Sequence, residues 1–438
     1  MTGVATAGHG ELAQPQPPDS ELLAMLQEVD AGRIEASVRR LAAFGTRHTL
    51  SSQDDPVRGI GAARDWIFDQ LTGFAAASGG RMTVQKQSVV QPVGPLIPTP
   101  VVITNVIATL TGGAAPNRTY VVTAHYDSRC TDVLDYTSDA PGADDDASGV
   151  AVILELARIL ATRPTEATVI LAAVSGEEQG VLGSTLMAAQ YKALGLDIQG
   201  MFSNDIVGSS TDEKGHQDPH VIRLFADGVP PTETPTQANT RQSIGGENDS
   251  PSRQLSRFVK DVAENAATDM TVRVIWRRDR YLRSSDHAPF LQQGYPVGRF
   301  TEPAENYAHE HQNVRVENGV QFGDLVEFCD FAFIARVARV NLATVWSLAQ
   351  GPGVPRGVKI DASVLTNQST LHWQPNTEAD LAGYEVVWRE TTEPEWTRVI
   401  PVGNVTSVTI DLVKDNVMFG VRAVDTEGHR SPAAFPQP

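Results

Sequence analysis

The sequence predicts an α/β protein: a three-layer αβα domain with a mixed, mostly parallel sheet, followed by a small all-β sandwich. Apolar strands alternate with amphipathic helices through the first 350 residues, which is typical of a sheet covered by helices on both faces. After a proline- and glycine-rich break at residues 351–357, short alternating strands separated by turn residues take over. That second pattern is typical of a β-sandwich.

The composition is globular and acidic. The chain has 438 residues, 41% of them hydrophobic, and a formal net charge of −18, which fits two or three domains. We expect no nucleic-acid or membrane partner, because few basic groups would neutralise phosphates. The basic run at residues 277–280 is short and is interpreted as solvated surface. Cys130 and Cys329 lie far apart without CxxC spacing, so neither a disulfide framework nor a thiolate metal site is expected.

The elements follow in order along the chain. Residues 1–20 are rich in glycine, alanine, proline and glutamine; they are expected to be disordered and show no signal-peptide pattern. The α/β domain spans residues 21–350. Its predicted elements are helices within 21–74, strands at 101–110 and 119–124, a helix at 147–161, a strand at 167–174, a helix at 183–194, a strand at 200–207, a helix after Pro251, a strand at 271–276, a helix after Asp286 and a long helix at 325–349.

The segment after the 351–357 linker forms its own module, residues 358–438. Its predicted strands lie at 370–373, 383–388, 407–410 and 418–424. Trp373, Tyr384 and the run Phe419–Asp425 resemble a fibronectin type III module. We expect this module to contact the α/β domain or another protein.

Acidic and imidazole side chains gather where the predicted strands end. His125 and Asp127 follow the strand at 119–124; a histidine there can bind a metal through one ring nitrogen while a carboxylate fixes the other. Most His-x-Asp motifs, however, are simply pairs of surface residues. Asp144, Asp145 and Asp146 precede a helix and would repel one another unless a cation or the helix N-terminus compensates. An acidic helix cap is the alternative.

Three further segments complete the set. Glu177 and Glu178 follow the strand at 167–174, where one could bind a metal and the other accept a proton from water, although adjacent glutamates are usually surface charges. Asp205 lies at a strand end, and His309 and His311 lie in a polar loop before the last helix. Sites of open α/β sheets form at the carboxyl ends of the strands, so together these segments predict a metal site there.

In combination the motifs resemble the two-zinc bacterial leucyl aminopeptidases and their metallopeptidase relatives. The resemblance covers residues 47–349. It is carried by His125-Tyr-Asp127, Pro141–Gly149, Glu177-Glu178 with Gly180 and Gly183-Ser184, Asn204-Asp205, and Ser285-Asp286-His287-Ala288. It implies a zinc-exopeptidase domain with two Zn²⁺ ions. Asp286 and His287 match a family segment that supplies no zinc ligands.

The resemblance assigns roles residue by residue. Asp145 would bridge both ions, His125 and Asp205 would complete one, and Glu178 with a late histidine would complete the other. Glu177 would be the general base, and Asp127 would contact the ring nitrogen of His125 that does not bind the metal. In the family the last histidine is typically followed four residues later by aspartate. His309 has Asn313 at that distance, so His309 is the choice and His311 the alternate.

The function that the resemblance implies is removal of residues from peptides or proteins with a free N-terminus. It favours a secreted or periplasmic location, although no signal peptide is visible. Three alternatives stay open. A glutaminyl cyclase uses a related fold, and a carboxypeptidase or dipeptidase would need a cation for a substrate carboxylate, which Arg283 or Arg241 could supply. An inactive peptidase-like scaffold is the third.

Overall fold

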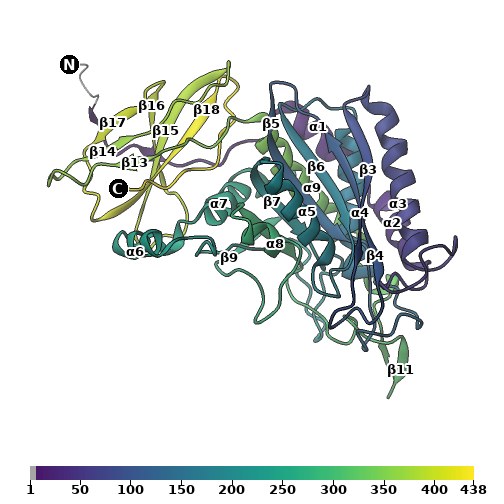
Figure 1. The fold of residues 1–438 in the computed structure, drawn as a ribbon. Helices are drawn as coiled ribbons and strands as arrows, with labels where there is room; N and C mark the ends of the chain where they lie inside the picture. The colour runs from purple at the N-terminus through teal and green to yellow at the C-terminus, as the bar shows by residue number, and fades with distance from the viewer. Residues whose placement is uncertain (1–5) are drawn as a thin grey trace.

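The computed structural model describes residues 6–438, and its α/β domain is built on one eight-stranded mixed sheet (Figure 1). The strand order is β3-β4-β6-β5-β7-β10-β8-β9. The strands are β3 Met82–Gln91, β4 Val101–Leu110, β5 Ala115–His125, β6 Ala167–Val174, β7 Asp197–Asn204, β8 Val221–Phe225, β9 Thr271–Ile275 and β10 Val297–Thr301. The four central strands β6, β5, β7 and β10 are parallel, whereas β3 and β4 run antiparallel at one edge. The predicted fold class is confirmed.

Helices cover both faces of this sheet. They are α1 Ser20–Glu28, α2 Ala31–Ala42, α3 Ile60–Ala75, α4 Gly149–Leu160, α5 Leu182–Ala193, α7 Pro251–Ala263, α8 His287–Gln292 and α9 Phe331–Gln350. A further helix, α6 Pro235–Ser243, buries no residue and lies outside these layers. Because successive side chains of a strand point to opposite faces, β5 serves two cores. Tyr120 and Val122 pack in the core that contains α4 and α9, while Val121 packs in the core that contains α5 and α8.

Helix α9 is the central helix of the larger core. Asp330 caps its N-terminus by accepting a hydrogen bond from Phe333 N, which satisfies one of the free N–H groups of the first turn. Within residues 6–438, α9 is the one helix long and apolar enough to cross a membrane, but 78% of its apolar window is buried inside the fold. That burial is the behaviour of a core helix.

The C-terminal module is a β-sandwich of two four-stranded sheets, β1-β17-β14-β13 and β18-β15-β16-β2. Its own strands are β13 Lys359–Ile360, β14 Ser369–His372, β15 Leu381–Glu390, β16 Arg398–Gly403, β17 Ser407–Ile410 and β18 Val417–Asp425. Leu371, Tyr384, Val386 and Phe419 fill the space between the sheets. The four strands predicted for this module overlap the observed strands β14, β15, β17 and β18.

Residues 6–12 contribute two short strands to this sandwich. Strand β1 (Thr6–Ala7) pairs with β17 and strand β2 (Glu11–Leu12) pairs with β16, so each adds to one sheet. The prediction of disorder over residues 1–20 is therefore wrong from residue 6 on, and residues 1–5 lie outside the described part. Pairing with the sandwich satisfies backbone groups that an edge strand leaves free, and composition does not reveal such pairing.

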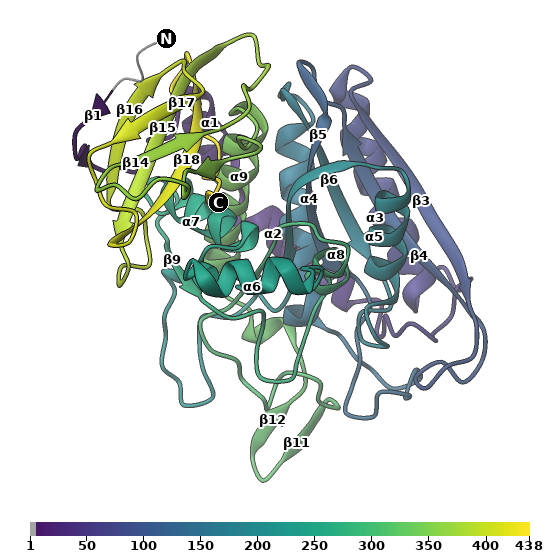
Figure 2. The same cartoon turned by 60° about the vertical axis from the view of Figure 1, so that its left-hand side comes forward.

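The sandwich lies beside the α/β domain (Figure 2), and buried ion pairs connect the two. The Asp249 carboxylate lies 3.2 Å from Arg257 Nη1 of α7 and 2.6 Å from Arg389 Nη2 of β15, and all three side chains are almost fully buried. On the other side, Arg118 of β5 pairs with Glu378 at 3.0 Å. The sandwich is thus in direct contact with the α/β domain.

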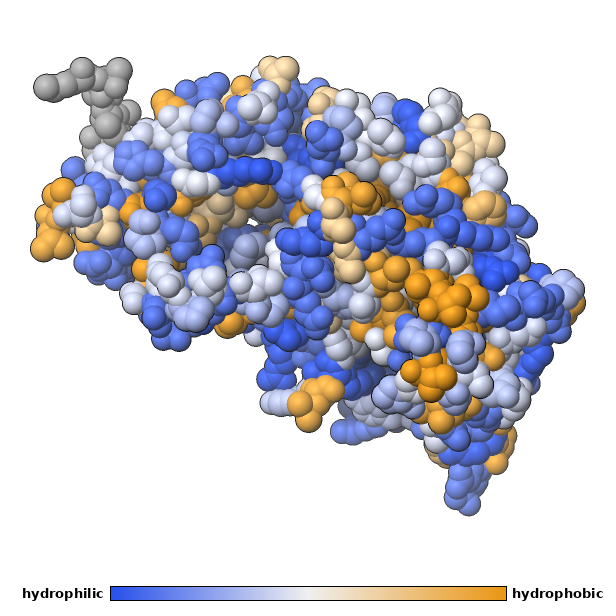
Figure 3. Space-filling view, viewed as in Figure 1, coloured by the Kyte–Doolittle hydropathy of each residue, from blue (hydrophilic) through white to orange (hydrophobic). Residues whose placement is uncertain are grey.

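The carboxyl edge of the sheet carries exposed loops. The β3–β4 hairpin runs past the end of β6 and exposes Val90, Val93 and Val102, and hydrophobic residues gather over the same part of the α/β domain in Figure 3. A second hairpin, formed by β11 (Arg315–Glu317) and β12 (Val320–Phe322), projects from the molecule (Figures 1 and 2). Between these hairpins lie the loops that carry the predicted ligands.

Candidate metal centre

The predicted ligands meet because their strands are neighbours. His125 ends β5, Glu178 follows β6 and Asp205 follows β7, and these three strands are adjacent and parallel. Their carboxyl ends therefore open at the same edge of the sheet. Asp145 reaches this edge from the irregular turn before α4, where its peptide bond to Asp146 is cis.

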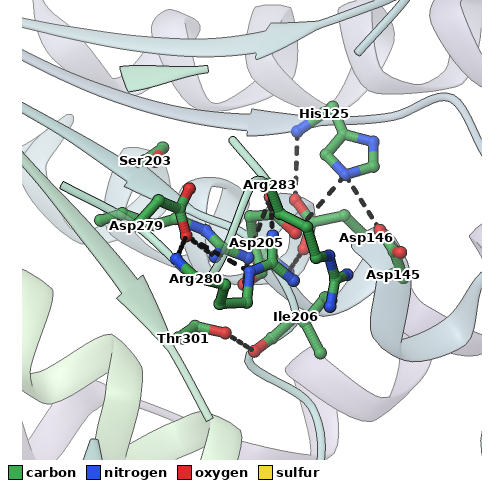
Figure 4. A network of polar contacts seen from close by, with 12 residues as sticks. His125, Asp145, Asp146, Ser203, Asp205, Ile206, Asp279, Arg280, Arg283 and Thr301 are labelled. Carbon is green, nitrogen blue, oxygen red and sulfur yellow. Dashed lines mark hydrogen bonds and ion pairs between the residues drawn. The ribbon is translucent and has the colours of Figure 1, made fainter. Parts of the chain in front are cut away.

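The first donor group consists of His125, Asp145 and Asp205, whose ligand atoms lie within 4.8 Å of one another. His125 Nε2 lies 3.0 Å from Asp145 Oδ1 and 3.8 Å from Asp205 Oδ1 (Figure 4). On the far side of the ring, Nδ1 lies 3.1 Å from the Asp127 carbonyl oxygen and 3.6 Å from its Oδ1. These contacts orient Nε2 toward the group.

The second donor group consists of Asp145, Glu178 and His311. His311 Nε2 lies 2.9 Å from Asp145 Oδ2 and 3.2 Å from Glu178 Oε1. Asp145 belongs to both groups, and its two carboxylate oxygens face different histidines. Asp145 therefore lies between the two donor groups.

The structure brings His311, and not the preferred His309, to the donor groups. The His309 ring stacks on Phe328 with ring centroids 3.5 Å apart and an interplanar angle of 7°, so it is engaged in packing. His311 adopts a left-handed backbone conformation, with φ of 54°, and projects into the site. Asn313 exchanges two 3.1 Å hydrogen bonds with Thr131, one in each direction, and holds this loop to the loop that follows β5.

Glu177 stands beside the two groups without belonging to either. Its backbone N–H donates to Asp127 Oδ1 at 3.2 Å, and the Glu178 N–H donates to Asp127 Oδ2 at 3.0 Å. Asp127 therefore positions both glutamates as well as His125. Burial raises the pKa of the Glu177 carboxyl well above its usual value.

The electrostatics of this site fit a bound cation. Within residues 6–438, Asp145 Oδ1 and Glu178 Oε1 are buried and accept no hydrogen bond, which is costly for a carboxylate. Burial raises the pKa of Asp145, but the neighbouring His125 and His311 rings outweigh it and hold that pKa well below the usual range. Carboxylate and imidazole donors without thiolate are the set that catalytic zinc uses, so the residues present fit zinc.

Other predicted residues lie near the centre but outside the donor groups. Asp286 is buried at the start of α8, and His287 Nε2 lies 3.1 Å from the Arg278 carbonyl oxygen. Of the two cations proposed for a substrate carboxylate, Arg283 pairs with Glu305 at 2.5 Å, and Arg241 lies on α6 paired with Glu233.

Sequence reasoning missed three buried residues that support the site. Arg47 donates to the Tyr126, Pro141 and Gly142 carbonyl oxygens and so ties the loop after β5 to the aspartate turn. Asp324 accepts hydrogen bonds from Asp144 N and Asp145 N, both at 2.8 Å. Arg299 contacts Asp205. No local pattern marks them, because each reaches the site from a distant segment.

Comparison with known proteins agrees with this geometry. Residues 105–317 match Peptidase family M28. A protein from Pyrenophora teres f. teres named "Probable zinc metalloprotease" is 55% identical over 426 residues, covering 97% of this chain and 88% of its own. All residues of the two donor groups lie within the matched segment.

Solved structures share the fold at low identity. The LapA aminopeptidase of Legionella pneumophila superposes with a TM-score of 0.56 at 16% identity, over 78% of each chain. The glutaminyl cyclase of Macrostomum lignano gives a TM-score of 0.51 at 16% identity, over 76% of this chain and 94% of its own. These likenesses support the fold, while the curated relatives identify the family. The chain belongs to peptidase family M28 and is a zinc metalloprotease.

Proposed function

We propose that this metalloprotease is an aminopeptidase that works with two zinc ions. One observation carries the proposal: Asp145 lies between two complete donor groups, with Oδ1 facing His125 and Oδ2 facing His311. Each group offers three protein donors and leaves coordination positions open, as catalytic zinc sites do. When bound, a zinc pair polarises a carbonyl group and lowers the pKa of water towards about 7.

The protein residues supply positioning and proton transfer. Glu177 would accept a proton from the attacking water at a carboxylate oxygen and pass it to the nitrogen of the departing amine. Its carboxylate is left for this task because it belongs to neither donor group. Asp127 would keep the His125 ring in one orientation and both glutamates in place.

The surrounding charges favour a substrate with a free N-terminus over one with a free C-terminus. A carboxypeptidase or dipeptidase needs a cation that is free to bind the substrate carboxylate. Arg283, the nearer of the two predicted cations, is occupied by Glu305 and Glu310. The acidic surroundings suit an α-ammonium group better.

Two alternatives differ from this proposal in measurable ways. A glutaminyl cyclase working with one zinc would show a single metal ion per chain and would convert an N-terminal glutamine into a pyroglutamyl residue that stays on the peptide, with release of ammonia. An inactive scaffold would bind metal without turnover. We further propose that the β-sandwich is a fibronectin type III-like module whose role is to contact and stabilise the peptidase domain, as its buried ion pairs suggest.

The test is elemental analysis of zinc together with hydrolysis of amino-acid anilides, before and after removal of metal by a chelator. The proposal expects two zinc ions per chain, loss of hydrolysis on chelation and recovery on adding zinc. Anilides blocked at the amine should not be cleaved. Cleavage of peptides that are blocked at the N-terminus but free at the C-terminus would favour a carboxypeptidase instead.

A further inference from the structure

The outer oxygen of Asp205 is held by arginines. Asp205 Oδ1 faces His125, whereas Oδ2 lies 3.2 Å from Arg299 Nη2 and 4.0 Å from Arg280 Nη2 (Figure 4). Arg299 is fully buried, and its Nη1 lies 2.6 Å from Asp279 Oδ1. Asp205 therefore offers the centre only one oxygen, and its orientation depends on these two guanidinium groups.

The back of His311 meets a second chain of charges. His311 Nδ1 lies 4.0 Å from Glu310 Oε1, on the side of the ring away from Asp145. The Glu310 side chain is only 7% exposed and pairs with Arg283. The contact between His311 and Glu310 is electrostatic and not a hydrogen bond, and it attracts the Nδ1 side of the ring, the side on which a carboxylate commonly orients a metal-binding histidine.

Glu305 joins the two chains. Its Oε1 lies 3.3 Å from Arg280 Nη1, and its Oε2 lies 2.5 Å from Arg283 Nη1. Its side chain is 3% exposed, and it also pairs with Arg223 at 3.3 Å. One buried carboxylate thus contacts both the arginine that leads to Asp205 and the arginine that leads, through Glu310, to His311.

The network balances its own charge. It contains four guanidinium groups and four carboxylates: Arg223, Arg280, Arg283 and Arg299 with Asp205, Asp279, Glu305 and Glu310. A buried pair that loses one partner leaves an uncompensated charge. Without the charge of Glu305, Arg280 and Arg283 would each lose a carboxylate partner and shift. The positions of Asp205 and Glu310, which they contact, would then change.

We propose that Glu305 is a positioning residue for both metal ions of the centre. Through Arg280 it holds Asp205 for the first donor group, and through Arg283 and Glu310 it holds His311 for the second. This inference rests on the proposed two-ion centre. Loss of such outer contacts typically weakens metal binding about 10- to 100-fold, so Glu305→Gln should weaken both ions, whereas Arg283→Gln should weaken only the ion held by His311.

The test measures zinc binding to the metal-free full-length protein by equilibrium dialysis, with cobalt absorption as a second readout. Both dissociation constants of Glu305→Gln should rise about 10- to 100-fold. In a His311→Ala background only the first group remains. There, Glu305→Gln should still weaken binding, and Arg283→Gln should not. The matched control is Glu317→Gln, because Glu317 is exposed on β11 and pairs only with Arg315 among its described ion-pair partners.

Unfolding of each metal-free variant shows whether it is folded. If Glu305→Gln does not fold, Arg283→Gln and Arg280→Gln decide: the first should weaken only the His311 ion and the second only the Asp205 ion. The inference is overturned if Glu305→Gln folds and leaves one or both zinc dissociation constants unchanged. It is also overturned if a single arginine variant changes both dissociation constants or neither. A wild-type protein that binds fewer than two ions instead refutes the proposed function.

Discussion

Replacing His309 and His311 one at a time by alanine separates packing from metal binding within three residues of one loop. His311 Nε2 lies 2.9 Å from Asp145 and 3.2 Å from Glu178. Its loss removes one of three protein donors to one ion. Since changes to outer contacts alone weaken binding about 10- to 100-fold, His311→Ala should lose that ion at ordinary zinc concentrations and keep the other.

His309→Ala should show the opposite result. Its ring stacks on Phe328 at 3.5 Å, and aromatic pairs of this kind contribute about 0.5–1.5 kcal/mol beyond burial. The variant should therefore be less stable to unfolding by about 1 kcal/mol and retain both zinc ions. The two changes have the same chemistry, so each serves as the control for the other.

The measurements are zinc content by elemental analysis after exhaustive dialysis, and the free energy of unfolding of the metal-free proteins in urea. Zinc content should fall in His311→Ala and stay at two ions in His309→Ala, whereas the free energy of unfolding should fall in His309→Ala. Loss of a zinc ion in His309→Ala, with two ions retained in His311→Ala, would refute the placement of His311 in the second donor group.

Three other predictions follow from particular contacts. Glu177→Gln should retain its zinc and lose about 100- to 10,000-fold in turnover of amino-acid anilides; unchanged turnover would remove Glu177 as the base. Asp249→Asn leaves two buried arginines without a counter-charge and should cost about 3–5 kcal/mol of unfolding free energy in urea; a cost under about 1 kcal/mol would contradict a buried ion network. Hydrogen bonds to Asp19 and Asp425 raise the pKa of His429 to about 10. Because this folded value lies above the unfolded value of about 6.5, the stabilisation is complete below pH 6.5 or so and is lost as pH rises towards 10. We expect about 2 kcal/mol less stability at pH 10 than at pH 6, and a smaller difference in His429→Gln; equal differences in the two proteins would exclude this source.

The sequence predicted the parts of the site that depend on strand order. His125, Glu178 and Asp205 follow three strands, and adjacent parallel strands must bring their carboxyl ends together. Asp145 precedes an amphipathic helix that packs on the same sheet. For these residues, strand positions and motif order were enough to predict that the side chains lie close together.

The choice between His309 and His311 could not be made in this way. It depends on the left-handed backbone of His311 and on the Phe328 ring that takes up His309, and both are tertiary effects. The pattern of acids and bases in a loop gives no information about which side chain turns inward.

The interpretation of the basic run at residues 277–280 as solvated surface holds for Arg277 and Arg278, which are exposed, but fails for the other two residues for a similar reason. Local composition suggested solvated surface, but Asp279 and Arg280 are almost fully buried and join Arg299 and Glu305 behind the centre. Their partners come from segments twenty or more residues away. The strands Thr6–Ala7 and Glu11–Leu12 escaped notice because two residues are too few to show a periodic pattern.

The most direct test of the account is a crystal structure of the zinc-loaded protein with anomalous data collected at the zinc edge. We predict two peaks about 3.5–4 Å apart, one contacting His125 and Asp205, the other contacting Glu178 and His311, with Asp145 between them. A single peak, or a peak on His309, would contradict the two-ion centre.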